Sequence, residues 1–82
     1  MKTENIEIIQ INISGEDKPG LTSSLTGILA CHDAFILDIG QSNIHRTMTL
    51  GILFMTTTER SGQIMKELLF KASEMNMTIR FE

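Results

Sequence analysis

The segment from Gly15 to Leu21 holds the residues of this chain best suited to binding a small ligand. It follows an isoleucine-rich stretch and precedes apolar residues at helical spacing, so we predict a corner between a strand and a helix. Pro19 suits the first turn of the helix, and Asp17 offers a carboxylate oxygen to the free amides there. Those amides and the positive end of the helix dipole form a site for a carboxylate. The alternative is a well-capped helix start that binds nothing.

The sequence contains few residues suited to catalysis or metal binding. Cys31, His32 and His45 are the only thiol or imidazole groups in the sequence. The adjacent Cys31 and His32 point in different directions, so they do not make a metal site together. No Ser or Cys lies in a recognisable nucleophile motif, and the corner lacks the pattern of a phosphate-binding loop. We therefore predict no catalytic residue, no metal site and no cofactor in this chain.

The composition is that of a single globular domain. The chain has 82 residues, of which 41% are hydrophobic, which is enough apolar material for one small core. Its net charge of −3 and its scattered basic residues argue against nucleic-acid binding. One cysteine, no hydrophobic signal core and no run of ~20 apolar residues lead us to expect a cytoplasmic protein that does not enter a membrane.

Hydrophobic periodicity predicts six elements around the corner. The clearest is a strand over 47–57, in which every second residue from Met48 to Phe54 is large and apolar. The other elements are strands over 6–14, 35–45 and 77–81, a helix over 19–32, and a second helix capped by Ser61. A hairpin turn is predicted over 43–46. The inward residues of that second helix are predicted to be Ile64, Met65, Leu68, Leu69, Ala72 and Met75.

The order of these elements predicts an α+β, ferredoxin-like βαββαβ fold. Its four-stranded antiparallel sheet has the strand order 4-1-3-2, and both helices lie on one face. The strand over 35–45 is then an edge strand, in which Gly40 indicates a bulge or a close contact. An exposed edge must be blunted or paired. Because the first helix has a small, uncharged face around Gly27, we predict a homodimer through the Phe35 to His45 edge strand and this helix.

Two sets of residues carry a resemblance to a known family. The run from Ile13 to Leu21, Ile-Ser-Gly-Glu-Asp-Lys-Pro-Gly-Leu, resembles the signature of ACT domains, and the expected fold places residues 1–82 in a single domain of this kind. More narrowly, Asp-Ile-Gly-Gln at 38–41 and Leu-Gly-Ile-Leu at 50–53 resemble paired strand motifs of the N-terminal ACT domain of bacterial phosphoserine phosphatases.

The resemblance implies a regulatory domain of L-serine biosynthesis that senses L-serine or a related amino acid between two subunits. The corner amides would hold the carboxylate of the effector, and Asp38 or carbonyl groups of its strand would accept hydrogen bonds from the ammonium group. Asp17 would shape the loop rather than touch the ligand. The full set of implied ligand-binding residues is Asp17, Lys18, Pro19, Gly20, Leu21, Asp38, Ile39, Gly40 and Gln41.

The chain departs from the phosphatase pattern in two respects. Asp33 stands where the family usually has Gly after the first helix, but Asp tolerates the left-handed backbone expected there. The catalytic domain of such phosphatases is of the haloacid-dehalogenase type and binds Mg²⁺ through an Asp-x-Asp-x-Thr/Val loop, which does not occur here. The chain is therefore a fragment of a phosphatase or a freestanding ACT sensor, and a dimerisation module without a ligand is a third reading.

Overall fold

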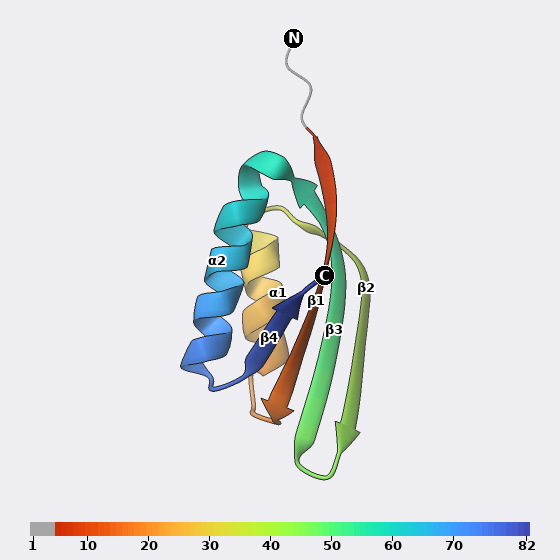
Figure 1. Ribbon diagram of the computed structural model, residues 1–82, viewed down its shortest axis with the longest axis vertical. Coiled ribbons are helices and arrows are strands. Elements are labelled where there is room, and N and C mark those ends of the chain that lie inside the picture. Colours follow the sequence, from red (N-terminus) through yellow and green to blue (C-terminus); the bar gives the residue numbers. More distant parts are fainter. Residues whose placement is uncertain (1–4) are drawn as a thin grey trace.

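The computed structural model describes residues 5–82 and has the predicted order of elements (Figure 1). The elements are β1 (Ile6–Glu16), α1 (Leu21–Cys31), β2 (Phe35–Ile44), β3 (Thr47–Thr57), α2 (Thr58–Glu74) and β4 (Thr78–Phe81). The four strands form one antiparallel sheet in the order β2-β3-β1-β4. This order is the predicted 4-1-3-2 read from the other edge, so the ferredoxin-like fold is confirmed.

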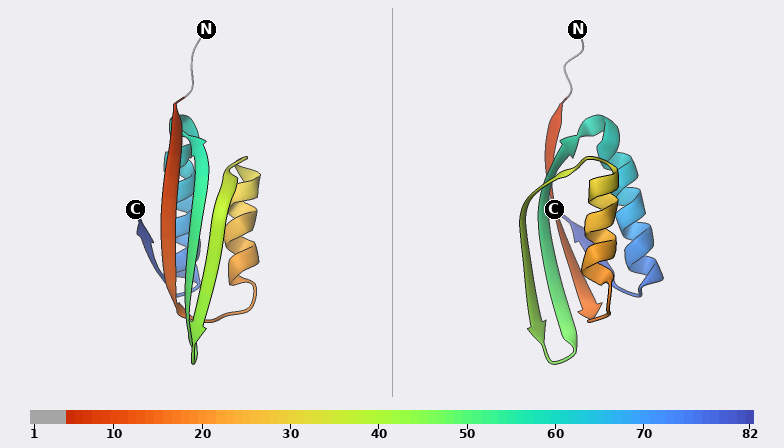
Figure 2. Two further views of the ribbon diagram at one scale, coloured as in Figure 1. Left: turned by 90° about the vertical axis from the view of Figure 1, so that its right-hand side faces the viewer. Right: turned by 180° about the vertical axis from the view of Figure 1, so that it is seen from behind.

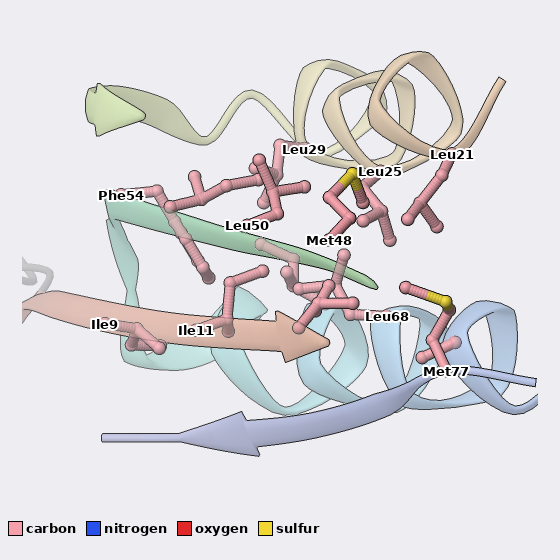
Figure 3. Close-up of a cluster of buried hydrophobic side chains, with 14 residues drawn as sticks. Ile9, Ile11, Leu21, Leu25, Leu29, Met48, Leu50, Phe54, Leu68 and Met77 are labelled. Atoms are coloured by element: carbon pink, nitrogen blue, oxygen red, sulfur yellow. The ribbon is translucent and has the colours of Figure 1, made fainter. Parts of the chain in front are cut away.

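Both helices cover the same face of the sheet, and the other face is open (Figures 1 and 2). Strand alternation explains this arrangement, because every second residue of β1 from Ile9 to Ile13 and of β3 from Met48 to Phe54 is buried under the helices. Leucines from α1 and α2 complete the core, as the close-up of Figure 3 shows. The described core consists of Ile9, Ile11, Ile13, Leu21, Leu25, Leu29, Met48, Leu50, Ile52, Phe54, Ile64, Leu68, Ala72 and Met77.

The first helix begins later than its sequence indicates. It starts at Leu21 with Gly20 as the N-cap, and no side chain caps it. The amide of Leu21 donates to the carbonyl of Lys18 at 3.3 Å, and Gly20 has φ 81° and ψ −1°. Pro19 and Gly20 therefore occupy the two central positions of a type II turn, where Pro and Gly are preferred. The predictions that Pro19 lies in the first helical turn and that Asp17 caps the helix are wrong.

The second helix begins earlier than predicted. β3 runs directly into α2, whose N-cap is Thr57, so Ser61 is not the cap. Ser61 is buried within the helix, and its hydroxyl donates to the carbonyl of Thr58 at 3.2 Å. Leu69, predicted to face inward, is 52% exposed. It lies on the side of α2 that a two-layer fold leaves in solvent.

The edge strand has its irregularity at a different residue from the one predicted. The bulge falls between Ile36 and Asp38, so Leu37 is the extra residue, whereas Gly40 pairs regularly with Gly51. The turn to β3 is shorter than predicted and contains only His45 and Arg46. After α1, Asp33 has φ 57°, which confirms the left-handed backbone expected at that position.

Candidate ligand-binding corner

The corner between β1 and α1 lies beside the turn that joins β2 to β3. The amide of Asp17 donates to the carbonyl of Arg46 at 2.9 Å, which holds the corner against this turn. Among residues 5–82, the amides of Lys18 and Gly20 have no backbone acceptor. The first turn of α1 adds further amides that lack an acceptor within the helix. The corner therefore presents free N–H groups near the positive end of a helix dipole.

The side chain of Lys18 points away from these amides. Its Nζ donates to the carbonyl oxygen of Met75 at 2.6 Å, at the C-cap of α2. A cation at this end of a helix pairs with carbonyls that have no partner inside the helix and with the negative end of the dipole. Lys18 therefore contributes its backbone to the corner, while its ammonium group ties the corner to α2.

The corner is joined to β2 by a chain of side-chain hydrogen bonds. Nε2 of Gln41 donates to Oδ1 of Asn43 at 3.0 Å, and Nδ2 of Asn43 donates to Oδ2 of Asp17 at 2.9 Å. Gln41 and Asn43 pair with the buried Leu50 and Met48, so both lie on the helix side of the sheet. Asn43 was absent from the predicted site, although its spacing of two residues from Gln41 is the signal for a shared strand face.

The structure divides the predicted strand-two residues between the two faces of the sheet. Ile39 pairs with the buried Ile52 and lies on the helix side, as Gln41 does. Asp38 and Gly40 fall on the open side, because the alternation resumes at Asp38 after the bulged residue. Oδ1 of Asp38 accepts a hydrogen bond from the amide of Ile39 at 2.9 Å. The corner, Ile39 and Gln41 therefore share one side, and Asp38 and Gly40 do not.

The edge beside the corner is open to a second molecule. A groove of about 420 Å³ separates α1 from β2 and is lined by residues that include Thr26, Ala30 and Phe35. A Cβ added to Gly27 would meet nothing within 4 Å. Ile39 is 43% exposed on the edge strand. The small face of α1 and the pairing edge of β2 are thus both free among the described residues.

Within residues 5–82, no three His, Cys, Asp or Glu residues lie close enough together to hold a metal ion. The chain does match a family. Residues 7–82 fit the family model described as the ACT domain. The chain belongs to the ACT domain family. It is therefore a regulatory, non-catalytic domain, as the resemblance implied.

No helix within 5–82 has the length and apolar character to span a membrane.

Solved structures with the same fold differ widely in sequence from this ACT domain. An ACT domain protein from Streptococcus pneumoniae superposes with a TM-score of 0.76 at 20% identity, over 95% of this chain and 89% of that one. A formyltetrahydrofolate deformylase from Burkholderia mallei superposes with a TM-score of 0.80 at 14% identity, over 92% of this chain and 27% of the deformylase. A protein from Galdieria sulphuraria superposes with a TM-score of 0.89 at 15% identity, over all of this chain and 52% of that one.

These likenesses establish the fold alone. The ACT domain spans about a quarter of the deformylase and about half of the Galdieria protein. No match to a curated protein was found. The narrower resemblance to the phosphoserine phosphatase domain stays a prediction.

Proposed function

We propose that this ACT domain binds a free amino acid where the corner of one copy meets the edge strand of a second copy. The observation that carries the proposal is that the free corner amides lie beside the open edge of β2, to which the corner of the same copy is held by the hydrogen bonds from Gln41 to Asn43 and from Asn43 to Asp17. An α-carboxylate fits the amides near Lys18 and Gly20. The ammonium group fits carbonyl oxygens of the edge strand. Asp17 shapes the corner, since its carboxylate accepts the hydrogen bond from Asn43.

The effector we propose is L-serine, and the parent protein a phosphoserine phosphatase. This rests on the motifs at 38–41 and 50–53, because backbone amides accept any α-carboxylate and do not select a side chain. Asp38 supports this proposal only as part of the motif at 38–41, because its side chain lies on the open face of the sheet and not on the side of the corner. The phosphatase reaction and its Mg²⁺ would belong to a separate catalytic domain. The alternatives are a freestanding sensor of another amino acid and a dimerisation module without a ligand.

The binding site can be tested by calorimetric titration with L-serine and a panel of other amino acids. Gln41→Ala removes the group that starts the hydrogen-bond chain, and we expect it to weaken binding at least tenfold. Gln10→Ala is the matched control, because Gln10 is exposed on the open face of the sheet and should leave affinity unchanged. Silence across the whole panel would favour the dimerisation module.

The parent protein can be tested separately by reading the coding sequence beyond residue 82. An Asp-x-Asp-x-Thr/Val loop downstream would support the phosphatase. A stop codon directly after Glu82 would rule out a catalytic domain downstream of this chain. Either result leaves the ligand-binding test interpretable, because the titration uses this chain alone.

A further inference from the structure

The first residues of β1 lie at an edge of the sheet that β4 is too short to cover. β1 has 11 residues, whereas β4 has 4 and pairs only with Ile11 to Ser14. Figure 1 shows β4 ending part-way along β1, whose first residues continue toward the N-terminus. We call Ile6 to Ile8 the free edge, because among residues 5–82 it has a neighbouring strand on its β3 side only.

The backbone groups of the free edge point away from the sheet. The amide of Gln10 donates to the carbonyl of Glu82 at 3.2 Å, and the amide of Glu82 donates to the carbonyl of Gln10 at 2.8 Å. The amide and carbonyl of Gln10 therefore face the β4 side. Because this direction repeats at every second residue of a strand, the same groups of Ile8 and Ile6 face that side too, beyond the end of β4. Two N–H groups and two carbonyl groups are thus left for another molecule.

The open-face side of the free edge is apolar. Ile6 is 59% exposed and Ile8 is 60% exposed. Ile8 pairs with Met55, and Met55 pairs with Phe35, which is 61% exposed. A strand added at the free edge would cover part of this apolar patch as well as satisfy the backbone groups, and both features are typical of an interaction site.

The helix side of the free edge carries an acid. Glu7 lies between the two isoleucines and points to the helix side, as the buried Ile9 does. Its Oε1 is buried and accepts no hydrogen bond from the residues that the structure describes. A buried acceptor without a donor is unfavourable, so a donor supplied at this position by an added strand would be stabilising.

Glu7 also argues against a second copy as the occupant. Within the described residues, antiparallel pairing of two free edges sets Ile6 of one copy opposite Ile8 of the other. The same register sets Glu7 opposite Glu7 of the second copy. Like charges directly opposite one another destabilise a strand pair, whereas opposite charges stabilise it. The free edge therefore favours a strand of different sequence, with a basic residue at this position.

We propose that the free edge binds an extended peptide segment of another protein, which adds to the sheet as an antiparallel strand in line with β4. The segment has apolar residues opposite Ile6 and Ile8, and each exchanges two backbone hydrogen bonds with the isoleucine that it faces. Its lysine or arginine opposite Glu7 donates to the carboxylate. The occupant is a peptide because an extended backbone repeats donors and acceptors at the spacing of Ile6 and Ile8. The free edge and β2 lie at opposite edges of the sheet, so this site is separate from the proposed amino-acid site.

NMR titration of the isotope-labelled domain tests the proposal, with the acetylated and amidated peptide Thr-Ile-Lys-Ile-Thr as the probe. We expect saturable shifts at the amides of Ile6 and Ile8. N-methylation of either isoleucine of the peptide should abolish binding, since it removes a donor that faces β1. N-methylation of the peptide lysine is the matched control. It should leave the affinity unchanged, because that amide faces away from β1.

An exchange of charges tests the role of Glu7. A peptide with glutamate in place of lysine should bind at least threefold more weakly, because its carboxylate faces Glu7. Glu7→Lys should reverse this preference between the two peptides. Circular dichroism and thermal unfolding verify that the variant folds, and the comparison of peptides on the wild type does not depend on it.

Four results would overturn the proposal. The first is the absence of shifts with every peptide, and the second is a set of shifts confined to β2, which would assign the peptide to the other edge. The third is equal loss of binding on N-methylation of lysine and of isoleucine. The fourth is a change at Ile6 and Ile8 that grows with protein concentration in the absence of peptide, which would assign the free edge to a second copy.

Discussion

Gly15 lies where the backbone leaves no room for a side chain. It has φ 154°, and a Cβ built there would lie 2.7 Å from the sulfur of Met77. Met77 is itself buried, so its side chain has little room to move aside. The end of β1 and the segment between α2 and β4 therefore approach as closely as they do because residue 15 has no side chain.

Gly15→Ala should lower the free energy of unfolding by about 1–3 kcal/mol, the usual cost of forcing extra volume into a packed site. Urea unfolding of the purified domain measures this change. Gly62→Ala is the control, because Gly62 lies in α2 and a Cβ there meets nothing within 4 Å. It should instead raise stability by about 0.5–1 kcal/mol, since Ala is the better helix former. Equal effects of the two substitutions would contradict the steric argument.

At the scale of elements, a polar junction fastens the end of α1 to the middle of α2. Oε2 of Glu67 accepts a hydrogen bond from Nε2 of Gln63 at 2.8 Å and lies 2.8 Å from Nε2 of His32. The hydrogen bond from Gln63, and then that from His32, hold the pKa of Glu67 below its ordinary value of 4.5, while burial acts in the opposite direction. The junction therefore favours the ionised carboxylate.

This junction should weaken in acid. The pKa of Glu67 is lower in the folded than in the unfolded chain, so its stabilising contribution is complete above pH 4.5 and is lost as the pH falls through the folded value. Urea midpoints measured between pH 7 and pH 3 should fall more for the wild type than for Glu67→Gln, which cannot ionise. Parallel profiles of the two proteins would show that the junction does not contribute to acid sensitivity.

At the scale of the whole molecule, the predicted homodimer depends on the small face of α1. A Cβ at Gly27 is open to solvent, and the groove between α1 and β2 runs beside it. Gly27→Glu places a charge where the two copies would meet, so it should dissociate this dimer and weaken amino-acid binding with it. Sedimentation and titration measure the two effects. Gly62→Glu is the control, because Gly62 is also exposed on a helix and a Cβ there meets nothing within 4 Å, and it should change neither.

The ligand site could be predicted only in part. The corner was located because Pro-Gly after a strand and before a helical pattern specifies a turn locally. The internal geometry of the corner could not be predicted, because Pro19 and Gly20 suit both a type II turn and the first turn of a helix. The direction of the Lys18 side chain could not be predicted either, because it depends on a hydrogen bond to the carbonyl of Met75, which is distant in the sequence. Asn43 was not predicted to lie at the site, because its hydrogen bond to Asp17 depends on how the chain folds.

The sequence by itself determined the order of elements, the strand order of the sheet and most residues of the core, with Leu69 as an exception. Those properties follow from periodicity and from the geometry of short connections, which act over neighbouring residues. Only the tertiary structure decided which face each residue of β2 presents. The bulge at Leu37 shifts the alternation by one residue, so Gln41 lies with the corner while Asp38 lies on the open face. A bulge arises from pairing between strands, and no local pattern in β2 specifies it.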